Sequence, residues 1–425
     1  MSILIKNGRV IDPGGNIDAV LDILVEDGRI SKVAKDITVP AKDMIDASGK
    51  IVMPGLVDMH VHLREPGRED KETVSSGSMA AIRGGVTSLL AMPNTTPAID
   101  SAENIRLLKK IIQKTANCNV FIAGSITSGR NGCRLVDVVS LKKEGVLAIT
   151  DDGSSVDSEE VMSEALKNAN KEKLLVISHC EDRSLANGGV MNLGYISTQL
   201  GLRGISNGSE YKRVARDIEL AQKTGAAIHI AHISCRESVE LVAAAKKKGL
   251  HVSAEAAPHH FALCDEELMS YDTNLKMNPP LRSKDDVAAI RQGLTDGTID
   301  AIASDHAPHT ENEKEIEFDR AEFGVIGLET ELAVSITELV DKGLLSWLEL
   351  AKRLSFNPSR ILGINKGTLS AGSDADIIII DPSKEWKVAA EGLVSKSKNS
   401  AFLGRTLKGV VEYTICAGKV VYQQP

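Results

Sequence analysis

The sequence of 425 residues lacks the features that mark several classes of protein. It has no excess of basic residues, since 50 Lys and Arg stand against 58 Asp and Glu, and the net charge of −8 argues against nucleic-acid binding. No apolar run approaches the roughly 20 residues that span a bilayer. The first residues lack the basic-then-apolar layout of a signal peptide. The six cysteines include no Cys-x-x-Cys pair, so neither a disulfide scaffold nor a zinc ribbon is indicated. We therefore expect a soluble, cytoplasmic enzyme with no nucleic-acid or membrane partner.

The remaining composition is that of an ordinary globular protein, with 42% hydrophobic and 25% charged residues. Its length allows one barrel-sized domain and a smaller one. Both ends of the chain consist of short, half-polar segments separated by glycine turns, as expected of a sheet with one wet face. We expect residues 1–55 and 365–425 to combine into a small β-sandwich domain, which leaves residues 56–364 as a separate domain.

Eight apolar runs divide this middle part, and each is followed by enough residues for a helix. The runs are residues 56–62, 86–92, 120–126, 146–150, 174–179, 227–233, 251–256 and 299–304. Their near-continuous hydrophobicity suits parallel strands that are buried on both faces. The sequence therefore predicts an α/β fold, a (β/α)8 TIM barrel with the β-sandwich attached. A doubly wound open sheet is the structural alternative, because periodicity alone does not show that the sheet closes.

Histidine and aspartate gather at the C-terminal ends of five of these runs, which is the rim where TIM barrels carry their active sites. These residues are His60, His62, Asp152, His179, His232 and Asp305. His60 and His62 are two apart, so on a strand both rings project from the same face. Imidazole and carboxylate ligands suit Zn, Fe or Mn. Six ligands are too many for one tetrahedral ion with an open position, so we expect two metal ions that share a bridging carboxylate.

The other histidines are interpreted differently. His229 has the opposite strand parity to His232, so we expect it to face the helix layer and to be structural. His251 opens its run at the bottom of the barrel and is also expected to be structural. His309 follows the last run and could turn back over the pocket.

Several motifs resemble those of a known family. Residues 53–62 (Met-Pro-Gly-Leu-Val-Asp-Met-His-Val-His) and 372–376 (Gly-Ser-Asp-Ala-Asp) are similar to the two ends of the cyclic-amidase branch of the amidohydrolase superfamily. More narrowly, residues 62–67, 91–95 and 305–309 resemble the bacterial type I dihydroorotases. The resemblance runs over the whole chain. It implies a metal-centred TIM barrel that carries a small β-sandwich built from both termini.

The resemblance also implies that the six rim residues are the ligands, usually of two zinc ions. Many relatives bridge the metals with a carboxylated lysine at the end of the fourth strand. Here that run ends in Asp151 and Asp152, with no lysine between Gly145 and Asp152. Type I dihydroorotases have an aspartate at that place. Asp152 is favoured on the family match, and Asp151 stays the competing candidate.

Recognition of the substrate can be argued in part from the residues. Arg64 lies two residues beyond His62, so its guanidinium points toward the metals if the strand geometry persists. Such a fork of donors matches a carboxylate bidentately. Asn94, after the second run, supplies an amide that donates and accepts. The resemblance implies that Arg64, Asn94 and His309 hold the substrate carboxylate. It further implies that Asn278 and the backbone near Phe323 and Gly324 contact the substrate ring.

The implied activity is that of a dihydroorotase, the zinc-dependent, reversible cyclisation of N-carbamoyl-L-aspartate to L-dihydroorotate in pyrimidine biosynthesis. Asp305 would carry the proton between the attacking water and the leaving ring nitrogen. Part of the charged stretch 310–323 is expected to close over the substrate, although a solvated loop is the default interpretation.

Two alternatives stay open. A related dihydropyrimidinase, hydantoinase or allantoinase shares the fold and the metals but need not have the carboxylate site at Arg64. A metal-free scaffold for aspartate carbamoyltransferase should have lost several ligands, and all six are present. We expect a homodimer, and association with aspartate carbamoyltransferase could accompany activity.

Overall fold

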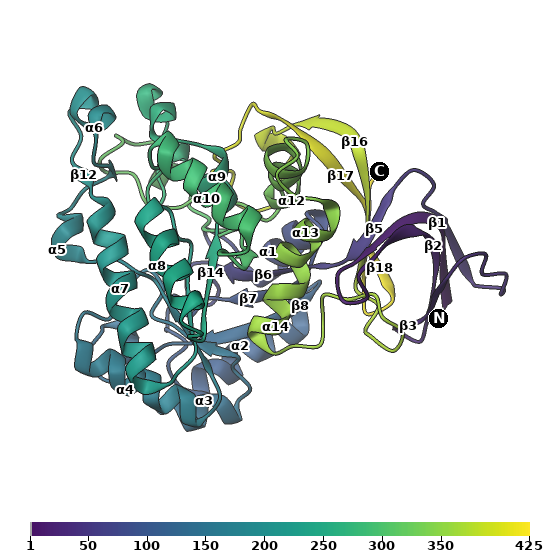
Figure 1. The fold of residues 1–425 in the computed structure, drawn as a ribbon, viewed down its shortest axis with the longest axis horizontal. Helices are drawn as coiled ribbons and strands as arrows, with labels where there is room; N and C mark the ends of the chain where they lie inside the picture. The colour runs from purple at the N-terminus through teal and green to yellow at the C-terminus, as the bar shows by residue number, and fades with distance from the viewer. Residues whose placement is uncertain (1) are drawn as a thin grey trace.

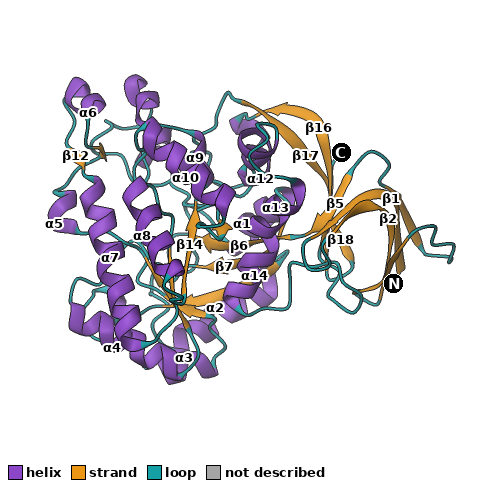
Figure 2. Cartoon of the chain, in the orientation of Figure 1, coloured by secondary structure: helices purple, strands orange, loops and turns teal. Residues whose placement is uncertain are grey.

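The computed structural model describes residues 2–425, and its chain forms two bodies that lie side by side (Figure 1). One body is a barrel of strands surrounded by helices. The other is a curved sheet that contains both chain termini (Figure 2). Among the described residues, no helix combines the length and the apolar character needed to cross a membrane.

Within residues 2–425, the barrel consists of eight strands that are paired in chain order. They are β6 (Leu56–Val61), β7 (Val86–Ala91), β8 (Asn119–Gly124), β9 (Ala148–Ile149), β10 (Leu175–Ser178), β13 (Ile228–Ile230), β14 (Val252–Ala256) and β15 (Ala301–Ile302). All neighbouring pairs are parallel. The two ends of the sheet meet where Val61 forms a parallel bridge with His306, and the His62 N–H donates to the His306 carbonyl at 2.9 Å. The predicted barrel is therefore confirmed, and the open sheet is excluded.

Both faces of the barrel strands are buried, which explains their continuous hydrophobicity. On β10, Val176 packs with the surrounding helices, whereas its neighbour Ile177 packs with residues of other strands such as Ala123 and Ala301. Each of these four side chains is at most 4% exposed, so the interior is filled by side chains and only the rim is open to a ligand.

Helices follow the strands and form the outer layer. The main ones are α1 (Val74–Arg83), α2 (Ala102–Thr115), α3 (Val138–Lys143), α4 (Glu159–Lys171), α7 (Asn207–Thr224), α8 (Arg236–Lys247) and α10 (Lys284–Asp296). Side chains of Thr73, Ser101 and Ser158 accept hydrogen bonds from the first turns of α1, α2 and α4, and so fix where these helices begin. After β15 the layer is completed by α12 (Glu331–Ser335), η4 (Ile336–Val340), α13 (Trp347–Ala351), η5 (Lys352–Phe356) and α14 (Asn357–Leu362).

Shorter elements stand in the loops at the rim. They are η1 (Ser128–Arg130), α5 (Arg183–Ala186), β11 (Met191–Asn192), α6 (Tyr195–Leu200), β12 (Gly204–Ile205), α9 (Pro258–Ala262), η2 (Asp265–Ser270), η3 (Thr273–Leu275) and α11 (Glu311–Lys314). β11 and β12 form a small parallel pair of their own.

The terminal strands form one continuous sheet in the order β18-β17-β16-β5-β1-β2-β3, with β4 also paired to β1. They are β1 (Ser2–Asp12), β2 (Ile17–Glu26), β3 (Arg29–Ala34), β4 (Asp43–Asp46), β5 (Ile51–Pro54), β16 (Ile377–Lys387), β17 (Thr406–Cys416) and β18 (Lys419–Gln423), with the short helix η6 (Ala390–Gly392) between β16 and β17. Ile5 of β1, Ile23 of β2, Ile379 of β16 and Ile415 of β17 share one apolar core, so the sheet curls around it. That this part folds as a separate domain of residues 1–55 and 365–425 stays a prediction.

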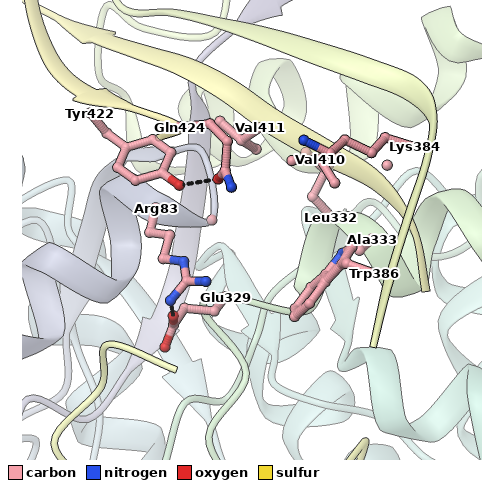
Figure 3. A pocket seen from close by; sticks show the side chains of 12 residues that line it. Arg83, Glu329, Leu332, Ala333, Lys384, Trp386, Val410, Val411, Tyr422 and Gln424 are labelled. Carbon is pink, nitrogen blue, oxygen red and sulfur yellow. Dashed lines mark hydrogen bonds and ion pairs between the residues drawn. The ribbon is translucent and has the colours of Figure 1, made fainter. Parts of the chain in front are cut away.

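The seam between the two bodies holds a small cavity of about 110 Å³, lined by residues of α1, α12 and β16 to β18 (Figure 3). Four of its polar side chains form two pairs. Arg83 lies 3.1 Å from the buried carboxylate of Glu329, and the Tyr422 hydroxyl donates to Gln424. We interpret this cavity as a packing feature of the seam.

Gly84, which ends α1 next to this seam, is expected to be essential for close packing. A Cβ atom there would lie 1.9 Å from the backbone oxygen of Leu328. Gly84→Ala should therefore lower the free energy of unfolding by about 1–3 kcal/mol. The matched control is Gly392→Ala, whose added Cβ meets no atom of the described chain within 4 Å. Denaturant unfolding followed by circular dichroism checks this, and equal midpoints for the two variants would contradict it.

Candidate metal centre and active site

The six side chains predicted as ligands converge at the C-terminal rim of the barrel, although they come from five different strand ends. They form two groups that share His60, namely His60 with Asp152 and His232, and His60 with His62 and Asp305. In each group the potential ligand atoms all lie within 4.8 Å of one another. His179 lies beside the first group, with its Nδ1 3.0 Å from Nε2 of His232.

Asp152 lies between the two groups. Its Oδ1 is 3.2 Å from Nε2 of His60 and 3.5 Å from Nε2 of His232, whereas its Oδ2 is 3.4 Å from Nε2 of His62. The two oxygens of one carboxylate therefore face different sets of imidazoles. This is the arrangement that a carboxylate shared by two cations requires.

The donor atoms of this cluster fit a divalent metal. His60 Nε2 and Asp152 Oδ1, which face each other in the cluster, are buried and have no hydrogen-bond partner among residues 2–425. The same holds for His179 Nε2 and His232 Nδ1, on rings whose other nitrogens face Asp152. Buried polar atoms are rarely left unpaired in native proteins, so such a set needs an explanation. Burial by itself lowers the pKa of His60, but the nearby carboxylates of Asp152, Glu255 and Asp305 raise that pKa well above its usual value. The cluster therefore favours positive charge at its centre, and imidazole with carboxylate suits a transition metal.

The backbone is strained where it presents these side chains. Arg64, His232 and Asp305 have φ angles of 63°, 32° and 47°, in the region that side chains other than glycine seldom occupy. Strain of this kind persists where the surrounding structure imposes it, often at functional sites. At His232 and Asp305 the turn in the chain aims the side chain at the cluster just after the strand has ended.

The structure separates the two aspartates at the end of β9. The Asp151 carboxylate accepts hydrogen bonds from the backbone N–H groups of Ile126 and Thr127, at 2.8 and 3.0 Å, and from the Thr127 hydroxyl. Asp151 therefore holds the loop that follows β8. Only Asp152 of the pair lies in the cluster, as the family match favoured.

Glu255 is a site residue that the sequence analysis missed. Its carboxylate accepts from Nδ1 of His60 at 2.8 Å and from Nε2 of His229 at 3.1 Å. Burial raises the pKa of Glu255, but these two hydrogen bonds lower it to about 2. The carboxylate fixes the His60 ring so that Nε2 faces the cluster, the usual carboxylate–histidine support of a metal site. A glutamate inside an otherwise apolar strand was the signal that could have identified it.

The expectation that His229 faces the helix layer is wrong. Its neighbours Ile228 and Ile230 pack into that layer, and His229 lies on the other face of β13 with Glu255. The parity argument failed because the regular strand ends at Ile230 and His232 has a φ of 32°. Strand alternation no longer applies after that point.

The side chains predicted to bind a carboxylate lie together beside the cluster. The Arg64 Nε donates to the Pro308 carbonyl at 3.1 Å, and the Arg64 Nη2 is 3.2 Å from Nε2 of His309. His309 Nε2 also lies 2.9 Å from the Phe323 carbonyl oxygen, an acceptor only, so this nitrogen carries a proton. Arg64 and His309 thus bring two donors side by side, and an anion placed between them satisfies both.

Asn94 has a role beyond the predicted one. Its Oδ1 accepts from Nδ1 of His62 at 2.8 Å, which leaves Nε2 of that ring toward the cluster. Its amide nitrogen stays available to the cavity. Asn278 donates to Glu181 at 3.2 Å, and the other Glu181 oxygen lies 3.8 Å from Nε2 of His179.

One cavity of about 320 Å³ is lined by every predicted site residue except His60, which is buried behind it. The size suits a small molecule. Gly324 closes one wall, and a Cβ there would lie 2.8 Å from the Cβ of Ala307. The lining also contains Lys71 and Arg130. The sequence did not indicate them, because a lysine or arginine in a loop is usually exposed to solvent.

The stretch 310–323 is more than a solvated loop. Lys314 of α11 is 3% exposed, and its ammonium donates to the carbonyl oxygens of Glu322 and Gly324 at 2.8 and 3.0 Å. Burial lowers the pKa of Lys314 to about 7. This lysine holds the segment against the site, and closure over a substrate stays a hypothesis.

Comparison with known proteins identifies the family. Residues 49–238 match the family model described as dihydro-orotase-like. A dihydroorotase from Elusimicrobium minutum is 52% identical over 99% of this chain and 97% of its own length. A dihydroorotase from Pelotomaculum thermopropionicum is 49% identical, with 100% and 99% covered.

Among solved structures, an L-hydantoinase (dihydropyrimidinase) from Arthrobacter aurescens superposes with a TM-score of 0.91 at 26% identity, covering 99% of this chain and 96% of its own. A D-hydantoinase structure reaches a TM-score of 0.87 at 23% identity, with 100% and 95% covered, which shows the fold alone. The sequence identity of about one half over the full length of these dihydroorotases establishes the family. The chain belongs to the dihydroorotase family.

Proposed function

We propose that this chain is a dihydroorotase that interconverts N-carbamoyl-L-aspartate and L-dihydroorotate with two zinc ions per subunit. The observation that indicates the substrate is the pair of donors, Arg64 and His309, beside a cluster of side chains that could bind metal. Dihydroorotate has a carboxylate next to the ring nitrogen that is made or broken. An anion site beside a metal site therefore matches its two functional parts.

The proposed substrate contacts follow from the donors in the cavity. Arg64 presents a planar guanidinium that pairs with a carboxylate through two parallel hydrogen bonds. His309 Nε2–H and the free amide nitrogen of Asn94 add neutral donors. Asn278 and the backbone at Phe323 and Gly324 stand along the cavity wall, where they would contact the ring amide groups. This recognition would hold the ring with its amide carbonyl toward the metal cluster.

The six rim residues would hold the metals, with Asp152 shared between the two groups and His60, His62, His179, His232 and Asp305 completing them. Bound zinc would polarise the ring carbonyl and lower the pKa of water toward neutrality. Glu255 and Asn94 keep the ring nitrogens of His60 and His62 aimed at the cluster.

Asp305 is the proposed proton carrier. It is 7% exposed, faces the cavity, and has Oδ1 3.2 Å from Nε2 of His62. In ring opening it would accept the proton of the attacking water and deliver it to the leaving ring nitrogen. By microscopic reversibility, the same carboxylate would take that nitrogen proton during ring closure.

A hydantoinase or dihydropyrimidinase activity is the related alternative, since solved structures with those titles share the fold. Hydantoin and dihydropyrimidine rings carry no obligatory carboxylate. The donors at Arg64 and His309 would then lack a partner in the substrate, which favours dihydroorotate. Turnover of dihydroorotate compared with dihydrouracil, hydantoin and allantoin separates these activities.

The cytoplasmic location, the homodimer and an association with aspartate carbamoyltransferase remain predictions. Leu193, Tyr195, Met269 and Tyr271 are large exposed apolar side chains near α6 and η2, with Tyr195 79% exposed. This face is a candidate for protein contacts. Analytical ultracentrifugation of the pure chain, alone and with aspartate carbamoyltransferase, tests both.

Removing the guanidinium should weaken substrate binding without affecting the metals. We expect Arg64→Met to raise KM for dihydroorotate about 100-fold, because a charged bidentate contact is lost. The metal content by elemental analysis should be unchanged. Arg320→Met removes an arginine of the nearby loop whose side chain is 64% exposed, and it should leave KM as it is. An unaltered KM in Arg64→Met would exclude the proposed carboxylate site.

The neighbouring aspartates provide a matched test of the metal site. Asp152→Asn should lower metal affinity by about 10–100-fold or more, since a shared charged ligand becomes neutral. Asp151→Asn should keep the metal and lose stability instead, because its backbone hydrogen bonds weaken. Elemental analysis after dialysis, with dihydroorotate turnover before and after chelation, measures both effects. Loss of metal from Asp151→Asn alone would reverse the assignment.

Asp305→Asn should separate proton transfer from ligation. The amide keeps an oxygen toward the metals but cannot accept the proton, so kcat should fall by about 100- to 10,000-fold. Parallel metal analysis is the control for ligand loss. Normal kcat in a metal-loaded Asp305→Asn protein would remove this residue as the proton carrier.

A further inference from the structure

Lys71 lines the active-site cavity but has no part in the proposed reaction. It lies in the loop between β6 and α1 and is only 5% exposed. Its Nζ is 3.0 Å from Nδ1 of His309 and 2.9 Å from Oε1 of Glu313. A lysine buried at this depth is uncommon unless its ammonium is paired.

These contacts determine which nitrogen of His309 carries the proton. An ammonium group only donates, so Nδ1 of His309 must accept from Lys71. On the other side of the ring, Nε2 lies 2.9 Å from the Phe323 carbonyl oxygen, an acceptor, and 3.2 Å from the Arg64 Nη2, a donor. Because Nδ1 already accepts from Lys71 and the acceptor is the nearer neighbour of Nε2, the proton of a neutral ring belongs on Nε2. Burial, followed by the charges of Arg64 and Lys71, lowers the pKa of His309 to about 2, so the ring is neutral. His309 is therefore the Nε2–H tautomer, whose proton lies against the Phe323 carbonyl at the cavity wall and can be shared with an acceptor placed beside Arg64.

Without Lys71 the opposite tautomer would gain a partner. Oε2 of Glu313 lies 3.5 Å from Nδ1 of His309, close enough to attract a proton to that nitrogen. Nε2 would then present a lone pair to the cavity, where it repels a carboxylate. Lys71 occupies the position between the two groups, because it pairs with Glu313 and donates to His309.

We propose that Lys71 is a positioning residue for substrate binding, which fixes His309 as the Nε2–H tautomer so that it donates to the substrate carboxylate beside Arg64. This inference rests on the proposed function, since it assumes that the anion between Arg64 and His309 is the carboxylate of dihydroorotate. Lys71 acts through His309, and the tests are chosen to detect that dependence.

The first test is a split between KM and kcat. Lys71→Met keeps the chain length and apolar stem but removes the charge and the donor. We expect KM for dihydroorotate to rise about tenfold or more, with kcat within about threefold and metal content unchanged. Lys366→Met is the control for losing a half-buried, paired lysine, since Lys366 pairs with Asp374 and Asp376 and none of the three lines the cavity. Wild-type KM in Lys71→Met would overturn the inference.

The second test is a double-mutant cycle with His309→Ala. If Lys71 acts through His309, the Lys71→Met change should alter KM by no more than about twofold once the histidine is absent. Fully multiplicative effects of the two substitutions would show an independent role and overturn the inference.

The third test detects the tautomer of His309 by NMR and does not depend on an activity measurement. Long-range 1H–15N spectra of the metal-loaded protein with 15N-labelled histidine should show His309 protonated at Nε2 and bare at Nδ1. The signals are assigned by their loss in His309→Ala. Lys71→Met should lose this single tautomer. Lys71→Arg keeps a donor and should retain the tautomer, and it provides the test if Lys71→Met does not fold. A wild-type ring protonated at Nδ1, or a tautomer unchanged in Lys71→Met, would contradict the inference.

These measurements distinguish a failure of the proposed function from a failure of the proposed role of Lys71. A wild-type protein that does not turn over dihydroorotate, yet shows the predicted tautomer, contradicts the proposed function. A wild-type protein that turns over dihydroorotate, with KM unaffected by Lys71→Met, contradicts only the role of Lys71.

Discussion

The structure depends on one electrostatic constraint, the burial of the Asp152 carboxylate among imidazole rings at the barrel rim. Its Oδ1 lies within 3.6 Å of nitrogens of His60, His179 and His232, yet it has no hydrogen-bond partner in residues 2–425. A carboxylate buried at this depth is costly unless positive charge balances it. Five strand ends converge here, and the backbone is strained at His232, because potential cation ligands must be brought around the Asp152 carboxylate.

A second layer of side chains makes the first layer rigid. Glu255 and Asn94 each take one ring nitrogen of a histidine, so the other nitrogen faces the cluster. Glu255 is in turn held by His229, and Asp151 is used to anchor the loop after β8. Orientation of this kind lowers the entropy lost when ligands bind, because the donor atoms are already in place. The proposed metal centre and substrate site would share this support, since Asn94 contacts His62 and also lines the cavity.

The barrel could be predicted because eight apolar runs are long and regular, and the rim residues because they end those runs. The choice between Asp151 and Asp152 could not be made from adjacent positions alone, since it depends on the loop of Thr127, which lies distant in the sequence. Strand parity misplaced His229 because the regular strand stops before His232. Lys71 was missed for a different reason. Its burial depends on His309 and Glu313, which are more than two hundred residues away, and no local pattern carries that information.

Arg64, Lys71 and Arg130 line the cavity together with Asp152, Asp305 and Glu322, and the way Arg64 is held explains why it can attract an anion. Arg64 donates to one backbone carbonyl, and Lys314 donates to three, so neither charge is cancelled by a carboxylate in these contacts. Glu313 pairs with Lys71 and offsets part of the field. Backbone carbonyls satisfy the N–H donors but leave the net charge, which acts over longer distances in a buried site. The open substrate carries two carboxylates and the cyclic one carries a single one. Arg64, with His309 beside it, would therefore attract both forms and would select the carboxylate that they have in common.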